Sequence, residues 1–146
     1  GAILTAFEQI GGADAACQLA RDYALERHTF GRPIGSYQAV KHKLADMAVK
    51  IELARSNAYF GAWAMYAGEN ADRSLAAAAS RLSATTAFEY AARECIHLHG
   101  GIGYTWEADC HFFYKRSRLL AVILGQPGAW VDQLLADTSL NQLQIR

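Results

Sequence analysis

The chain carries groups that bind anions at the point where one helical pattern ends and another begins. Arg27 has a guanidinium that stays charged and offers paired donors to oxyanions, and Thr29 adds a hydroxyl. Together with backbone N–H groups at such a junction, these side chains could hold an anion. The simpler alternative is a helix C-terminus, where Arg27 and His28 complement the helix dipole and Gly31 and Pro33 end the helix. The residues alone leave both interpretations open.

Metal binding is the second chemistry to test. Helical bundles build di-iron centres from paired Glu-x-x-His motifs, and only one such motif is present, from Glu94 to His97. Cys17, Cys95 and Cys110 are odd in number and share no Cys-x-x-Cys spacing, which argues against a disulfide framework and against a zinc site. We therefore predict no metal and interpret the cysteines as small buried apolar residues.

A glycine pair, Gly100–Gly101, follows the third helical pattern. It does not follow a strand, so the dinucleotide fingerprint of parallel-sheet folds does not apply, and a phosphate-binding P-loop is absent from the sequence. Glycines directly after a helix still let another molecule approach the backbone closely. His97 and His99 beside them are expected to flank a loop, one held by a local hydrogen bond and the other partly exposed.

The bulk composition indicates one helical domain. The 146 residues suffice for a single core, and 14 basic against 14 acidic side chains leave no net charge, so nothing points to nucleic acid or a membrane surface. No apolar run reaches membrane-spanning length, and the N-terminus lacks the pattern of a signal peptide, so a cytoplasmic location is expected. Two prolines and few β-type clusters favour an almost entirely helical domain.

Apolar residues at three-and-four spacing predict where the helices lie. We expect an all-α, up-down bundle of four main helices plus a short C-terminal helix. The expected ranges are 3–28, 36–67, 71–98, 106–124 and 129–136, with a chain reversal around 68–70 and a disordered tail after 136. Ser36 is expected to cap the second helix through its hydroxyl.

The same spacing predicts which side chains face the core. The expected inward positions are Phe7, Ile10, Cys17, Ala20, Ala24, Val40, Leu44, Met47, Ile51, Ala54, Ala58, Ala62, Met65, Leu75, Ala79, Leu82, Thr86, Phe88, Ala91 and Cys95. Gly11 and Gly12 lie inside the first helix at a cost of about 1 kcal/mol each, which close approach of a neighbouring helix or ligand would explain. The alanine run 76–79 suits close helix packing or an oligomer contact.

Two blocks of sequence resemble the acyl-CoA dehydrogenases. Tyr23-Ala-Leu-Glu-Arg-His-Thr-Phe-Gly31, followed by Gln38-Ala-Val40 and Leu44-Ala-Asp-Met47, is similar to the start of that family's C-terminal helical domain. Cys95-Ile-His-Leu-His-Gly-Gly-Ile-Gly-Tyr-Thr-Trp-Glu107 is similar to its other C-terminal signature, in the right order and at the expected distance. The resemblance covers about residues 2–125.

The resemblance implies contacts with FAD. In the family, the arginine that matches Arg27 lies against the FAD pyrophosphate of the neighbouring subunit, and the segment that matches the glycine pair meets the adenosine part. The family usually has glutamine where His97 stands, and histidine keeps a donor and an acceptor. For Phe30, core packing and cofactor contact are equally open. The candidate cofactor-binding residues are Arg27, Thr29, Phe30, Gln38, His97, Gly100 and Gly101.

The catalytic base is not identified by the resemblance. Most members carry a glutamate at the position that aligns with Leu124, and a smaller group carries it at the position of Gly1, but neither residue is a carboxylate. Glu8, Glu94 and Glu107 match no base position and are expected to be solvated or capping carboxylates. The base could lie upstream of this segment, the chain could lend Arg27 to a catalytic partner, or the protein could be an inactive relative; the first is favoured.

The resemblance also implies a larger enzyme. Residues 1–146 form one domain of a flavoenzyme that oxidises acyl-CoA and passes electrons to an electron-transferring flavoprotein, and the family's N-terminal helical and central β domains are missing from this segment. The isolated segment is therefore expected to retain little FAD and to be inactive. Self-association into dimers or dimers of dimers is expected. The alternative is a non-catalytic helical assembly subunit of a heteromeric or degenerate acyl-CoA dehydrogenase.

Overall fold

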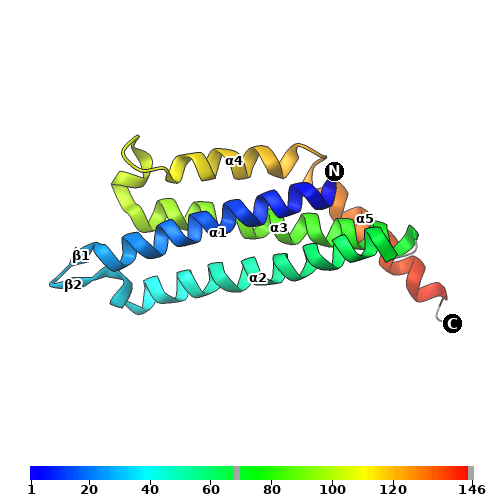
Figure 1. The fold of residues 1–146 in the computed structure, drawn as a ribbon, viewed down its shortest axis with the longest axis horizontal. Coiled ribbons are helices and arrows are strands. Elements are labelled where there is room, and N and C mark those ends of the chain that lie inside the picture. Colours follow the sequence, from blue (N-terminus) through cyan, green and yellow to red (C-terminus); the bar gives the residue numbers. More distant parts are fainter. Residues whose placement is uncertain (68–69, 145–146) are drawn as a thin grey trace.

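Five helices account for most of the structure, a computed structural model that describes residues 1–67 and 70–144 (Figure 1). The helices are α1 (Ala2–Glu26), α2 (Gln38–Ala67), α3 (Asn70–His99), α4 (Cys110–Val122) and α5 (Pro127–Gln144). Between α1 and α2 lie two short antiparallel strands, β1 (His28–Thr29) and β2 (Arg32–Pro33), and a 3₁₀ turn, η1 (Ile34–Ser36). A second 3₁₀ turn, η2 (Gly100–Tyr104), follows α3. The all-α prediction is confirmed.

Helix α3 is the centre of the bundle, because it packs against α1, α2, α4 and α5. Its direction relative to the others follows from paired residues. Gln9 on α1 meets Thr85 and Tyr23 meets His99, so α1 runs parallel to α3. Helices α2 and α4 run antiparallel to α3, and α5 continues beyond the end of α4 (Figure 1). Four helices thus alternate up and down, as predicted.

Small residues allow the helices to approach closely. Ala76 and Ala78 are fully buried within the chain, which accounts for much of the alanine run without an oligomer contact. A Cβ on Gly12 would lie 2.4 Å from the Phe88 ring, so α3 approaches α1 there, whereas a Cβ on Gly11 would meet nothing within 4 Å. A neighbouring helix therefore explains the second glycine but not the first.

The first helix ends two residues earlier than predicted. Arg27 is extended (φ −75°, ψ 121°) and His28 begins β1. Phe30 and Gly31 both have positive φ angles (51° and 78°) between the paired residues Thr29 and Arg32, which is the geometry of a tight hairpin turn. Gly31 therefore serves the hairpin rather than the end of the helix, and the simple C-terminus interpretation is wrong in that respect.

Other element boundaries also differ from the predictions. Helix α2 begins at Gln38, and the hydroxyl of Ser36 donates to the Pro33 carbonyl (2.7 Å) instead of capping that helix. Helix α4 begins at Cys110 rather than Trp106, because η2 and a turn precede it. Helix α5 is not short: it extends to Gln144, where a disordered tail was predicted. Residues 68–69, at the predicted reversal, lie outside the described residues.

Most of the predicted core positions are buried or half-buried, but Ala62, Met65 and Thr86 are exposed. In the last part of α2 the inward positions are Gly61 and Ala64, and on α3 Thr85 is buried in place of Thr86, so the inward face lies one position before the one assigned. Polar Gln9 and Arg81 are buried instead. Among the described residues, no individual helix has the length and apolar composition of a membrane span; α4 and the first part of α5 reach it only as a pair bent by 49°.

Candidate functional site

One end of the bundle brings the two signature blocks together. Tyr23 near the end of α1 stacks on His99 at the end of α3, with ring centroids 4.1 Å apart. Its hydroxyl also lies 3.5 Å from the His99 carbonyl oxygen. The β1–β2 hairpin and the chain that joins α3 to α4 consequently lie at the same end of the molecule (Figure 1). Arg27, which follows α1, and Gly101 in η2 therefore lie toward the same end of the bundle although 74 positions separate them.

The hairpin holds an aromatic ring in solvent. Phe30 is 94% exposed, so core packing, one of its two predicted roles, is wrong. Its positive φ angle of 51° is uncommon for a residue other than glycine, and such backbone strain concentrates at functional sites. A strained, exposed phenylalanine contributes little to folding, and it is well placed to pack against a planar group.

Next to this ring lies a groove of about 420 Å³ that joins the two signature blocks. Thr29 and Phe30 line it from the hairpin, and His97 lines it from α3. Lys43 on α2 supplies a positive charge that the sequence reasoning did not single out. A groove with an aromatic ring, hydroxyl, imidazole and ammonium group suits a planar, phosphate-bearing ligand.

The other predicted cofactor residues lie at the same end without lining this groove. Arg27 and Gln38 are exposed, and Gln38 is the first residue of α2. Gly100 and Gly101 are also exposed, and a Cβ on either would meet nothing within 4 Å. Gly100 needs its positive φ of 63° to turn the chain out of α3, while Gly101 leaves open backbone. An exposed guanidinium at the same end as open glycine backbone could receive an anionic group.

An ion-pair network supports His97. Glu94 on α3 is buried, with its side chain only 7% exposed, and it pairs with Lys43 of α2 and with Arg93. His97 Nδ1 lies 3.4 Å from Glu94 Oε2 and 3.4 Å from Lys43 Nζ. Glu94 was predicted to be solvated or capping, and that prediction is wrong. Its carboxylate orients both the lysine and the histidine of the groove.

Replacing Glu94 with glutamine should make stability depend less on pH. Burial by itself would raise the pKa of Glu94, but the hydrogen bonds and charges of Lys43 and Arg93 outweigh it and hold the pKa below its ordinary value of 4.5. A lowered folded-state pKa adds stability at neutral pH that is lost as the pH falls below 4.5 through the folded value. We expect Glu94→Gln to cost about 2 kcal/mol at pH 7 and much less at acid pH, measured by urea unfolding.

Glu107→Gln serves as the control for that comparison, because Glu107 is exposed. Its unfolding free energy should match that of the parent chain at both pH values. An equal loss for Glu94→Gln at neutral and acid pH would contradict the ion-pair explanation.

Gly1 and Leu124, the two positions that the resemblance aligns with the family's catalytic base, meet at the opposite end of the bundle. A Cβ built on Gly1 would lie 3.5 Å from Leu124 Cδ1. Two positions separated by nearly the whole chain therefore occupy one location, next to the start of α1 and the end of α4. Glu8 is exposed and paired with Arg116, and Glu107 is exposed, which fits the predicted solvated roles.

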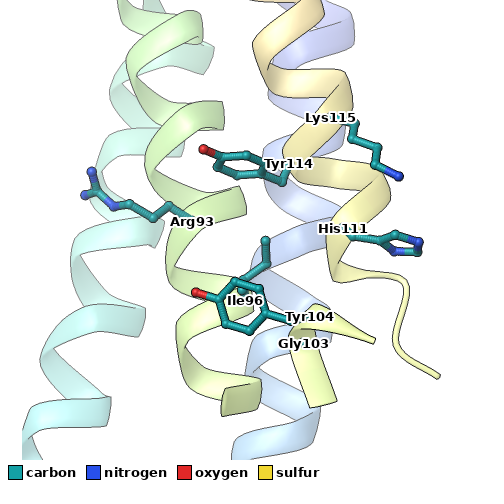
Figure 2. Close-up of a pocket in the computed structure, with 7 residues that line it drawn as sticks. All are labelled: Arg93, Ile96, Gly103, Tyr104, His111, Tyr114 and Lys115. Atoms are coloured by element: carbon teal, nitrogen blue, oxygen red, sulfur yellow. The ribbon is translucent and has the colours of Figure 1, made fainter. Parts of the chain in front are cut away.

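A second groove, of about 310 Å³, lies between α3, η2 and α4 (Figure 2). The rings of Tyr104 and Tyr114 lie between the helices, Arg93 extends from α3 on one side, and His111 and Lys115 extend from α4 on the other. Both ring nitrogens of His111 are buried without a hydrogen-bond partner among the described residues. None of the residues singled out from the sequence as cofactor contacts lines this groove.

The structure also gathers a cluster that the sequence reasoning missed. Cys95 and His99 lie one turn apart on α3, and Cys110 begins α4 beside them. The three donor atoms all lie within 4.8 Å of one another, and all three residues are buried. The Cys-x-x-x-His spacing on one helix face was the available signal, but the third member depends on how α4 folds back. Cys17 is only half-buried, unlike the other two cysteines.

Comparisons with known proteins define the class. The family described as acyl-CoA dehydrogenase, C-terminal domain, matches residues 1–133. The chain belongs to this family, and the resemblance is confirmed. Solved structures agree: a variant of the Tcur3481-Tcur3483 steroid ACAD has a TM-score of 0.91 at 28% identity, over 97% of this chain and 39% of that chain. The glutaryl-coenzyme A dehydrogenase–glutaryl-CoA complex has a TM-score of 0.86 at 29% identity, over 99% and 35%.

Curated relatives include acyl-CoA dehydrogenases. Acyl-CoA dehydrogenase IpdE2 of Mycobacterium tuberculosis is 45% identical over 126 residues, which is 86% of this chain and 37% of that protein. Acyl-CoA dehydrogenase FadE34 of the same organism is 37% identical over 145 residues, or 99% of this chain and 20% of that protein. This chain thus spans between a fifth and two-fifths of the length of these relatives.

Proposed function

We propose that this chain is the C-terminal domain of an FAD-dependent acyl-CoA dehydrogenase and that its hairpin end holds the adenosine and pyrophosphate of FAD bound to a neighbouring subunit. The observation that carries the proposal is the groove in which Thr29 and Phe30 of one signature block face His97 of the other. Because these residues come from distant parts of the sequence, a shared ligand gives a reason for their meeting.

Each residue has a distinct role in this proposal. Arg27 donates paired hydrogen bonds to pyrophosphate oxygens. Phe30 packs its exposed ring against a planar part of the ligand, and His97, held by Glu94, donates or accepts a hydrogen bond. Gly101 leaves room for the ligand against its backbone. Gln38 and Gly100 are exposed at the same end of the bundle and border the ligand in this proposal.

FAD, when bound, accepts the hydride that leaves the β-carbon of an acyl-CoA thioester. The chain itself presents glycine and leucine at the two positions where the family places its proton-abstracting carboxylate. Neither residue accepts a proton, so the base comes from elsewhere in the active assembly. The same observation favours the second candidate, a helical assembly subunit that lends its cofactor contacts to a catalytic partner.

Partners follow from the relatives. Subunit CarC of a caffeyl-CoA reductase–Etf complex from Acetobacterium woodii is 31% identical over 125 residues, and the ChsE4–ChsE5 complex of Mycobacterium tuberculosis has a TM-score of 0.86 at 25% identity. We propose an electron-transferring flavoprotein as the electron acceptor of the full-length protein. We also propose assembly with a second copy or with a related subunit.

Arg27→Met in the full-length protein tests the cofactor site. We expect FAD to bind about tenfold to a hundredfold more weakly, because a charge-assisted contact with the pyrophosphate is lost. Arg21→Met is the matched control: Arg21 is exposed on α1, six positions before Arg27, and pairs with its neighbour Asp22. Equal FAD affinity in both variants, measured by flavin fluorescence titration, would overturn the assignment of Arg27.

The 146-residue chain by itself should purify without stoichiometric FAD and without acyl-CoA turnover, since it supplies only one side of the proposed site. Visible flavin absorbance and a dye-reduction assay measure these two properties. A stoichiometric flavin in the purified chain would show that the domain needs no other part to hold the cofactor.

A further inference from the structure

Three buried side chains at the junction of α3 and α4 form a set of metal ligands. The Sγ atoms of Cys95 and Cys110 lie 3.5 Å apart, and Cys95 Sγ lies 3.9 Å from His99 Nδ1. Cys95 and Cys110 are fully buried and His99 is 5% exposed. Both cysteines are free thiols. We propose that Cys95, His99 and Cys110 form a three-ligand site for a thiophilic cation, Zn²⁺ or Cu⁺, separate from the cofactor groove.

The local fold explains why the donors converge. Cys95 and His99 are four residues apart, so they lie on the same face of α3. Gly103 in η2 packs against the end of α3, where a Cβ would lie 2.7 Å from the Ile96 carbonyl oxygen. This close approach turns the chain back and sets Cys110, the first residue of α4, against Cys95. Tyr23 stacks on the His99 ring and fixes its plane.

The distances match the chemistry. Zn–S bonds of about 2.3 Å at a tetrahedral angle place two sulfurs about 3.8 Å apart, and a Zn–N bond of about 2.0 Å places nitrogen and sulfur about 3.5 Å apart. The two separations that involve Cys95 differ from these values by a few tenths of an ångström. All three donor atoms lie within 4.8 Å of one another, so a small rotation of the His99 or Cys110 side chain closes the set around one ion. Two thiolates and an imidazole form a soft ligand set, and the two thiolates would neutralise a divalent ion in this buried location.

Two hydrogen bonds are given up when the metal binds. The Cys95 thiol donates to Cys110 Sγ in the metal-free chain, and both thiol protons leave to solvent when the thiolates coordinate the ion. His99 Nδ1 lies 2.8 Å from the Cys95 carbonyl oxygen, and because a carbonyl only accepts, Nδ1 carries the proton in the metal-free chain. A bound ion would take the place of that proton and give Nδ1 a coordinate bond instead. The metal would then link the end of α3 to the start of α4 and hold η2, which carries the glycine pair, between them.

Metal titration of the reduced, chelator-treated 146-residue chain tests the site, with Co²⁺ as a spectroscopic substitute for Zn²⁺ and with Cu⁺ in a parallel series. We expect one metal ion per chain and, for Co²⁺, a near-ultraviolet thiolate-to-metal band. Cys95→Ser and Cys110→Ser should each bind about a hundredfold more weakly and lose about half of that band. Cys17→Ser is the matched control and should bind like the parent chain.

Outcomes of these titrations separate the alternatives. The site is supported if the chain binds Zn²⁺ and Co²⁺, or binds only Cu⁺, and if binding depends on Cys95 and Cys110 as expected. Which of these metals binds identifies the ion of the site. His99→Gln keeps both thiols and tests the third ligand, since it should alter the visible cobalt spectrum. Absence of stoichiometric binding by the parent chain overturns the proposal whatever the variants do, and so does equal weakening by Cys17→Ser.

Discussion

Arg81→Ala is expected to lower the free energy of unfolding by about 4 kcal/mol, through lost hydrogen bonds and the cavity left behind. Arg81 is 1% exposed on α3 and connects three other helices. It donates to Gln9 Oε1 on α1 (2.5 Å) and to the Leu120 carbonyl near the end of α4 (2.8 Å), and it lies 5.9 Å from the Trp130 ring of α5. Burial lowers the pKa of this guanidinium.

Arg81→Met separates the two causes of the loss. Among the described residues no carboxylate lies within ion-pair distance of Arg81, so its charge is solvated only by neutral acceptors. Methionine fills most of the volume and removes the buried charge, so it should cost about half as much as alanine. Urea unfolding of the 146-residue chain measures both variants. Equal stability of the alanine variant and the parent would contradict the central role of Arg81.

Gly12→Ala is expected to destabilise the chain by about 2 kcal/mol, although alanine is the better helix former. A Cβ on Gly12 would lie 2.4 Å from the ring of Phe88, which is 1% exposed. Either the ring leaves its rotamer or α1 moves away from α3. Both changes reduce packing at the centre of the bundle.

Gly11→Ala is the matched control, one residue earlier on the same helix. A Cβ there meets nothing within 4 Å, so only helix propensity acts, and the variant should gain about 0.5–1 kcal/mol. The free energy of unfolding, measured by urea or thermal unfolding, should therefore rise for Gly11→Ala and fall for Gly12→Ala. Similar gains in both variants would show that helix propensity, rather than the contact with Phe88, governs this segment.

The cofactor site could be proposed from the sequence because its two halves are local blocks. Arg27, Thr29 and Phe30 lie in one short segment, and His97 lies beside the glycine pair in another. Their types and order carried the family resemblance, which the comparison confirmed. Lys43 and Glu94 could not be proposed in the same way, because an ion pair between α2 and α3 depends on which faces of two helices meet.

Local periodicity and chain-breaking residues were enough to determine that this protein is a helical bundle, since helix formation and its interruption depend on neighbours a few positions apart. Only the tertiary structure decided that Gly1 meets Leu124, that Cys110 joins Cys95 and His99, and that Arg81 is buried. The physical reason is the same in each case. Helices placed side by side bring together residues remote in sequence, and their relative rotation and depth arise from packing that no single segment encodes.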